Sequence, residues 1–307
     1  MQRPEFRDRK TSEASTVESG YLIPAHLTAG VAIFCAFVLV LLAVLGPLGL
    51  GVIHYKTSQS AIWQLEGQDL ADLFVIAPAL AIGGALILAN RVRSAKYFLI
   101  LTPVTLMYTG LSIGIGQEWS DPAYSGNVQN YFGIFLSMMI GGLILLVGTL
   151  SMFSERDAPN FKQRNLRIYV GVMGVFLSVF AAMWVSQILQ IINTGDLADH
   201  TYSAAPTVFW TIRYLDLGIS VPVGFLALSL LLSKPRKAFP IILLFFGFFI
   251  TMASVVNADV AVSIVHNDPS VASMGASVAI FPILGVLAVS GLLYLVKDKL
   301  PKIRALS

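Results

Sequence analysis

Long apolar stretches separated by short polar loops dominate the pattern of this sequence. Each stretch carries about 20 or more mostly apolar residues, the length that an α-helix needs to cross the roughly 30 Å hydrocarbon core of a bilayer. The pattern therefore predicts an all-α, polytopic membrane helix bundle with about eight transmembrane helices. The expected spans cover residues 25–53, 70–90, 97–116, 131–153, 168–192, 206–233, 238–262 and 271–296.

The positions of lysine and arginine set the expected orientation. All but two of the 20 basic residues fall in the N-terminal tail, in the loops after the second, fourth and sixth spans, or after the eighth. The two exceptions are Lys56 and Arg213. Because short basic loops stay on the cytoplasmic side, this alternation predicts a multi-pass protein of the cell (plasma) membrane with both termini in the cytoplasm.

Composition agrees with this class and excludes several others. The chain is 56% hydrophobic and 12% charged, with a mean hydropathy of +0.77, whereas a soluble domain carries about 25% charged residues. Cys35 is the only cysteine, which excludes an intrachain disulfide and a thiolate metal cluster. The first apolar stretch is too long for a cleavable signal and is interpreted as a retained anchor.

Two segments of the chain match each other at a constant offset of 144 residues. Asp72 and Pro78 in DLADLFVIAPAL align with Asp216 and Pro222 in TIRYLDLGISVPVG. The same offset brings the first four spans onto the last four without a gap, which favours a parallel 4+4 repeat. Regularly spaced helices that align by chance are the alternative. The expected units are a disordered cytoplasmic tail (1–20), a first transmembrane repeat (21–155), and a second transmembrane repeat (156–307) ending in a short basic tail.

Charged side chains inside the apolar spans mark the candidate site. Asp72 and Asp216 would lie about 27 to 29 Å from the basic loops at 1.5 Å per residue, near the outer border of the hydrocarbon. They could simply mark helix starts, where the helix dipole favours acids. Arg213 argues for more, because a cation there should seek Asp216 or Asp69 instead of lipid. The candidate binding residues are Asp69, Asp72, Arg213, Asp216, Glu66, Gln187 and Asp259.

Each of the two matched segments has a proline six residues after its aspartate. Proline has no N–H and displaces the carbonyl group four residues earlier, so Pro78 and Pro222 are expected to kink their helices. A freed carbonyl group inside a membrane needs a partner or lines a wet cavity. Kinks that serve only packing are the alternative.

Three histidines fall at the expected outer end of the spans, near several acids. His54, His200 and His266 are candidate ligands for a divalent metal, although no two of them have ligand spacing on one element. The spans contain no histidine or lysine in the middle for haem or retinal. Motifs for nucleotide binding and for nucleophilic catalysis are missing. We therefore expect no cofactor and no nucleic-acid partner.

Gly67, Gln68 and Asp69 open a segment that continues with Asp72, an aliphatic run and Pro78. This segment resembles a loosely defined group of prokaryotic multi-pass membrane proteins, which show a similar opening, a basic turn and a later aspartate–leucine helix. The resemblance extends over most of the chain from residue 63 onward. It implies the multi-pass fold and no particular activity.

Three functions are compatible with this pattern. The first is a small transporter or transport-like binding protein with a polar cavity that opens outward. The second is an accessory or structural subunit of a larger membrane complex, and the third is a membrane-embedded enzyme that uses the outer carboxylates. The repeat favours the first, and the missing catalytic motifs weaken the third. Expected partners are the lipid bilayer, a small molecule or ion, and other membrane proteins or a second copy of the chain.

Overall fold

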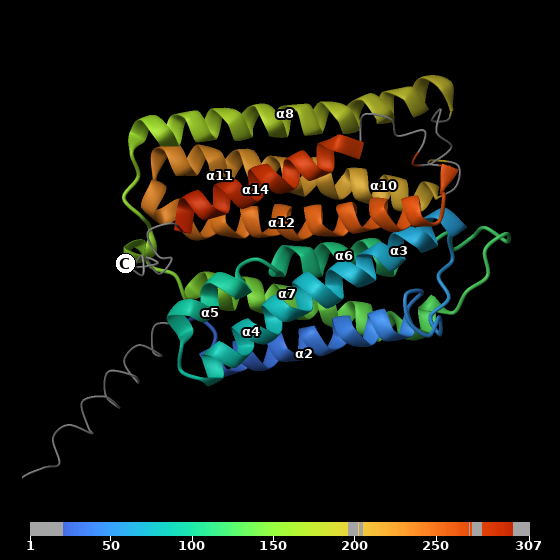
Figure 1. The fold of residues 1–307 in the computed structure, drawn as a ribbon, viewed down its shortest axis with the longest axis horizontal. Coiled ribbons are helices and arrows are strands. Elements are labelled where there is room, and N and C mark those ends of the chain that lie inside the picture. The colour runs from blue at the N-terminus through green and yellow to red at the C-terminus, as the bar shows by residue number, and fades with distance from the viewer. Residues whose placement is uncertain (1–20, 196–201, 203–204, 270, 272–277, 297–307) are drawn as a thin grey trace, which may run out of the picture.

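The computed structural model describes residues 21–195, 202, 205–269, 271 and 278–296, and these are built from helices without a strand (Figure 1). Within this described part, seven helical segments are long and apolar enough to cross a membrane. An eighth apolar helix, α14, is shorter, with 17 residues. The prediction of an all-α, polytopic membrane bundle is confirmed. The seven long segments are Ala25–Leu45, Gln59–Leu88, Val92–Ile115, Val128–Ser151, Gln163–Thr194, Pro206–Ser233 and Pro235–Val265.

Several of these segments are composed of more than one element. The second combines α3 (Gln59–Ala71), the π-helical turn η1 (Asp72–Ile76) and α4 (Ala77–Leu88). The sixth has the same composition, with α10, η4 and α11, and the third is interrupted between α5 and α6. The remaining elements are α2 (Ala25–Leu45), α5 (Val92–Leu99), α6 (Pro103–Ile115), η2 (Val128–Tyr131), α7 (Phe132–Ser151), η3 (Glu155–Asp157), α8 (Gln163–Thr194), α10 (Pro206–Leu215), η4 (Asp216–Ser220), α11 (Val221–Ser233), α12 (Pro235–Val265) and α14 (Ile280–Val296).

The helices form two groups that lie side by side and are here called the first half and the second half of the bundle (Figure 1). In the first group α2 packs against α4 and α7, and α6 packs against α7. In the second group α8 packs against α11, and α12 packs against α11 and α14. Contacts of α12 with α3 and α6, and of α10 with α6, join the groups. The junction of the two groups is therefore formed by the third and seventh spans together with the first halves of the second and sixth.

The second span begins eleven residues earlier than expected, at Gln59 instead of residue 70. Ser58 caps its N-terminus, since the Ser58 hydroxyl accepts a hydrogen bond from the backbone N–H of Ala61 at 3.3 Å. This is the usual role of a serine at such a position. The stretch between the first two expected spans (residues 54–69) is thus largely helical. As a result, 13 helical residues precede Asp72, and this aspartate does not mark a helix start.

The first span differs in the other direction, because its helix ends at Leu45 and not at residue 53. Gly46 closes it by donating its backbone N–H to the carbonyl of Leu42 at 2.6 Å. Pro47 follows, and proline cannot continue the hydrogen-bonded ladder of a helix. The segment after Leu45 folds back as a turn and reaches the second span near Asp69.

Both prolines singled out in the sequence follow a π-helical turn. In η1 the N–H of Ala77 bonds to the carbonyl of Asp72, and in η4 the N–H of Val221 bonds to the carbonyl of Asp216. Pro78 and Pro222 then occupy the first turn of the next α-helical segment, where a missing N–H is tolerated. The helix distortion expected from each proline is therefore a π-helical turn that starts at the preceding aspartate, Asp72 or Asp216. Such turns often occur at functional sites.

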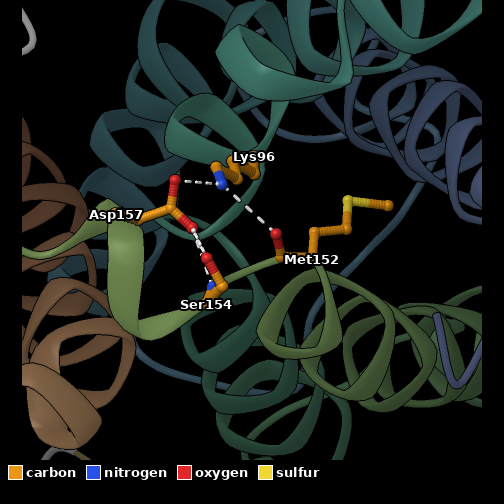
Figure 2. A network of polar contacts seen from close by, with 4 residues as sticks. All are labelled: Lys96, Met152, Ser154 and Asp157. Atoms are coloured by element: carbon orange, nitrogen blue, oxygen red, sulfur yellow. Dashed lines mark hydrogen bonds and ion pairs between the residues drawn. The ribbon is translucent and has the colours of Figure 1, made fainter. Parts of the chain in front are cut away.

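Three loops with basic residues, after the second, fourth and sixth spans, meet at one end of the bundle, here called the basic end (residues 89–92, 152–162 and 234). Figure 2 shows a network there, in which the buried Lys96 lies with its Nζ 2.7 Å from Asp157 Oδ1 and donates to the carbonyl of Met152 at 3.2 Å. Burial alone would raise the pKa of Asp157, but the hydrogen bonds from Lys96 and Ser154 and the charge of Lys96 outweigh it and lower this pKa. Lys96 thus ties the fourth span's end to α5.

Candidate functional site

Asp216 lies at the centre of the polar side chains in the second half. Its side chain is buried and accepts three hydrogen bonds: from Trp184 Nε1 at 2.9 Å, from the Tyr108 hydroxyl at 3.2 Å and from Ser220 Oγ at 3.3 Å. The donors come from α8, from α6 and from η4. Since buried polar groups are normally hydrogen-bonded, Asp216 is a satisfied acceptor that joins the first half to the second.

The local fold explains how these groups meet. Asp216 is the first residue of η4 and Ser220 the last, so the π-helical turn places the Ser220 hydroxyl above the carboxylate. Ten helical residues precede Asp216 in α10, which puts it inside the helix and not at its start. The interpretation of the two aspartates as helix-start markers is therefore wrong for both Asp72 and Asp216.

Arg213 lies over two aromatic rings. Its guanidinium carbon lies 3.6 Å from the ring centre of Phe209 and 4.2 Å from that of Trp184. Its Nη2 donates to Gln187 Oε1 at 2.6 Å. A cation over an aromatic face is attracted by the ring quadrupole, and a guanidinium group stacks on such rings particularly well.

The expected direct ion pair of Arg213 with Asp216 or Asp69 does not occur. Where both partners are described residues, ion pairs join Lys96 to Asp157, Lys237 to Glu155 and His266 to Glu66. The physical reason is the indole of Trp184, which stacks on Arg213 with its face and donates to Asp216 through its N–H. One aromatic side chain thus stands between the cation and the anion and contacts both.

Asp69 and Asp72 are buried in the first half and face different partners. Asp69 Oδ2 accepts the backbone N–H of Leu48 at 3.4 Å, in the turn after α2. Asp72 Oδ1 accepts from Gln68 Nε2 at 3.0 Å. Burial, followed by the charges of these two aspartates, raises the pKa of the nearby Tyr55 above its ordinary value. Tyr55 therefore remains a neutral phenol beside the acids.

Asp259 on α12 approaches these two aspartates from the other half. It lies close enough to Asp72 and Asp69 for their charges to interact. Gly67 makes the approach possible, because a Cβ atom there would clash with the Asp259 backbone. The buried Oδ1 of Asp259 has no hydrogen-bond partner among the described residues. Gly67, Gln68 and Asp69 thus have separate roles: close packing, a hydrogen bond to Asp72, and contact with the turn after α2.

A cavity of about 250 Å³ lies between the two halves and connects these groups. The first half contributes residues of α3 and α6, and the second half contributes residues of α8, α10, η4, α12 and α14. Polar side chains in its wall include Gln68, Tyr108, Ser112, Arg213, Asp216 and Asp259. Most of the remaining wall is apolar or aromatic. The lining extends to Thr57 and Gln117, which lie at the end of the bundle opposite the basic end.

The other predicted site residues lie near that opposite end or outside the described part. Glu66 Oε2 is 3.0 Å from His266 Nε2, and the His266 ring stacks on Trp63 with a centroid separation of 5.1 Å. Gln187 contacts Arg213, as described above. The candidate metal ligand His200 lies outside the described residues. Within the described part, no three acidic, histidine or cysteine side chains converge as metal ligands would.

The main contributors that sequence reasoning missed are Trp184, Ser220 and Gln68 as partners of the aspartates. Trp184 and Gln187 are three residues apart, a spacing that places two side chains on one face of a helix. An indole and an amide on one face of an apolar span could have indicated that this face of α8 borders a polar site. Ser220 had no such indication, because its position beside Asp216 depends on the π-helical turn.

Comparison with known proteins gives no relationship for this chain. Neither a protein-family model, nor a curated protein, nor a solved structure matches it.

Proposed function

We propose that this membrane protein binds a small molecule in the cavity between its two halves and acts as a small transporter or transport-like binding protein. The observation that supports this proposal is the cavity itself, which receives polar side chains from both halves. Ionisable groups inside a membrane protein are costly and usually serve a substrate or ion pathway. Binding sites between helices of a bundle are also a common arrangement.

The polar groups of the cavity support a binding role better than a purely structural one. Asp216 and Arg213 are embedded in hydrogen bonds and aromatic contacts, so their positions are fixed before any ligand arrives. Asp259 keeps a buried carboxylate oxygen without a hydrogen bond, which costs free energy unless another group compensates. A bound polar molecule that hydrogen-bonds to the other oxygen of the same carboxylate would offset part of this cost. A site for packing alone would not need the empty volume.

We retain the internal repeat as part of the proposal. The two π-helical turns begin at Asp72 and Asp216, which are separated by the same 144 residues as the sequence match. Packing also corresponds between the halves. In the first half α2 packs against α4, and at the matching positions of the second half α8 packs against α11. In the same way, the contact of α6 with α7 corresponds to that of α12 with α14. Across the junction, the contact of α3 with α12 corresponds to the contact of α10 with α6. In repeat-built transporters the substrate site lies at the repeat interface.

The orientation follows from the basic loops and also belongs to the proposal. If the basic end faces the cytoplasm, the opposite end with Thr57 and Gln117 faces outward. The cavity reaches toward those residues. We therefore place the protein in the plasma membrane with both termini in the cytoplasm and its cavity approached from outside.

An accessory subunit is the second candidate function, and α8 is the observation that favours it. Only 22% of the residues in the most apolar stretch of α8 are buried, compared with 39% to 61% in the corresponding stretches of the other long segments. Gly174 borders open space, and Ser178, four residues later on the same helix, is exposed. Small residues at this spacing let membrane helices pack closely. Crosslinking of Val175→Cys in membranes, in a Cys35→Ala background, would reveal a partner helix on this face.

The experiment for the proposed function measures ligand-dependent stability. Cys35 is the only cysteine and is fully buried, so a fluorogenic thiol reagent reports unfolding of the purified protein. A compound present at 100 times its Kd stabilises the folded state by about 2.7 kcal/mol. We expect a panel of small organic cations, anions, neutral solutes and inorganic salts to contain at least one that raises the unfolding temperature.

Two variants decide whether such a compound occupies the cavity. Val256→Trp fills volume in the cavity wall and should abolish the stabilisation. Val185→Trp adds the same side chain at an exposed position of α8 and should preserve it. A compound that stabilises both variants equally, or a panel without any stabilising compound, would contradict the proposal.

A further inference from the structure

We propose that the ligand of this cavity is an elongated organic ammonium ion, with Asp259 as its counter-charge; this inference rests on the proposed function. It combines three observations: the distribution of charge around the cavity, the free carboxylate oxygen of Asp259, and the aromatic wall along α12.

The two polar clusters at the junction differ in charge. On the side of the second half, Asp216 has three hydrogen-bond donors and the guanidinium group of Arg213 nearby. On the side of the first half, Asp259 lies within range of the charges of Asp69 and Asp72, and its backbone packs on Gly67. None of these three forms an ion pair in the described part of the chain. The cluster in the first half is therefore made of acids that no basic side chain of the described residues pairs with.

Asp259 is the acid of that cluster that a ligand can reach, because its side chain lines the cavity. Asp72 is already engaged by Gln68 and Asp69 by the backbone of Leu48. Neither oxygen of the Asp259 carboxylate has a hydrogen-bond partner among the described residues, and Oδ1 is shielded from solvent. An N–H group of a ligand in the cavity would therefore bind at Oδ2. A buried carboxylate without a partner is costly, and an ammonium group supplies both a hydrogen bond and the opposite charge.

An organic cation fits this site better than a metal ion. Metal ions such as calcium need several oxygen ligands in one place, and the described residues contain no such convergence of three ligands. An ammonium group can bind to one carboxylate. The rest of the ligand would then contact apolar and aromatic side chains, which make up most of the cavity wall.

The shape of the wall indicates an elongated molecule. Phe249 and Asp259 line the same cavity from one helix, and ten helical residues span about 15 Å. Phe248 and Phe180 also line the cavity. A ligand with its ammonium group at Asp259 would place an apolar or aromatic body against these rings.

The test uses three probes of matched length: 4-phenylbutylamine, which is protonated at neutral pH, 4-phenylbutan-1-ol and 4-phenylbutanoate. We expect the amine to raise the unfolding temperature of the purified full-length protein in nonionic detergent. The alcohol and the acid should not do so at the same concentration. In Asp259→Asn the apparent affinity for the amine should fall at least tenfold, whereas Asp121→Asn, which removes an exposed acid outside the cavity, should leave it unchanged.

Each outcome of this test is decisive. Equal stabilisation by the amine and the alcohol, or an Asp259→Asn affinity within twofold of the natural chain, would overturn the inference. No stabilisation by the amine would also overturn it. If Asp259→Asn does not fold, the comparison of the three probes on the natural chain decides alone. Binding of an anionic or neutral compound that Val256→Trp abolishes would refute the ammonium ligand but leave the proposed function intact.

Discussion

Trp184 holds Asp216 and Arg213 together, and replacing it by phenylalanine tests this arrangement. The substitution removes the indole N–H that lies 2.9 Å from Asp216 Oδ2. It preserves an aromatic face for the Arg213 guanidinium group, whose carbon is 4.2 Å from the ring centre. The perturbation is therefore directed at one hydrogen bond, with a smaller loss of ring surface.

The magnitude follows from the geometry. A hydrogen bond to a charged group contributes about 1.5–3 kcal/mol, and a bond between neutral groups about 0.5–1.5 kcal/mol. Trp184 makes the shortest of the three bonds to Asp216, so Trp184→Phe should cost about 2–3 kcal/mol including the smaller ring. Tyr108→Phe and Ser220→Ala remove bonds of 3.2 Å and 3.3 Å and should each cost less.

The assay is a double-mutant cycle with Asp216→Leu, read from unfolding in denaturant by the reactivity of Cys35. Without the carboxylate, Trp184→Phe should cost only the loss of ring surface, about 1 kcal/mol. The expected coupling between the two positions is therefore about 1–2 kcal/mol. Trp119→Phe is the matched control, because the exposed Trp119 donates to the carbonyl of Ile115 at 3.0 Å and has no contact with Asp216. Additive effects of Trp184→Phe and Asp216→Leu would refute the reasoning.

Three further predictions concern packing, pH and orientation. Gly67→Ala should destabilise by about 1–3 kcal/mol through overpacking against α12, measured by the same unfolding assay; a neutral effect would contradict the close approach. The pKa of Asp157 is lowered in the folded protein, so its contribution to stability is fully present above the ordinary aspartate pKa of about 4. This contribution is lost as the pH falls through the lowered pKa. Asp157→Asn should therefore flatten the dependence of stability on pH in that acidic range. In intact cells with Cys35→Ala, an impermeant thiol reagent should label Ser125→Cys, at an exposed position of the same loop, and spare Asn160→Cys; the reverse pattern would overturn the orientation.

The sequence was sufficient to predict the fold class because helix-length apolar runs are a strong constraint in membranes. Helix boundaries were predicted less well. The helical segment from residue 59 to 69 is polar, and hydropathy alone interpreted it as a loop, whereas the Ser58 cap and the packing of Gly67 on α12 make it helix. As a consequence, Asp72 appeared to stand at the start of a helix.

For the candidate site, the sequence indicated the unusual residues but not their partners. Asp216 and Arg213 stood out because ionisable groups are rare in apolar spans. The expectation that Arg213 pairs directly with Asp216 or Asp69 neglected the aromatic side chains of other helices, and Trp184 contacts both Arg213 and Asp216. Asp259 was one of several acids at the ends of spans. Its proximity to Asp72 depends on the packing of α3 against α12, which no single-chain pattern encodes.

The accessibility of the cavity tests the central claim of a ligand site between the two halves most directly. Val256→Cys in a Cys35→Ala background places the only thiol in the cavity wall, and Val185→Cys places it on the exposed face of α8. Thiol reagents act on the thiolate, which forms in water and not in lipid. With an impermeant, positively charged thiol reagent on intact cells, we predict labelling at residue 256 and none at residue 185. Absence of labelling at residue 256 in protein that is folded and present at the cell surface would contradict the account.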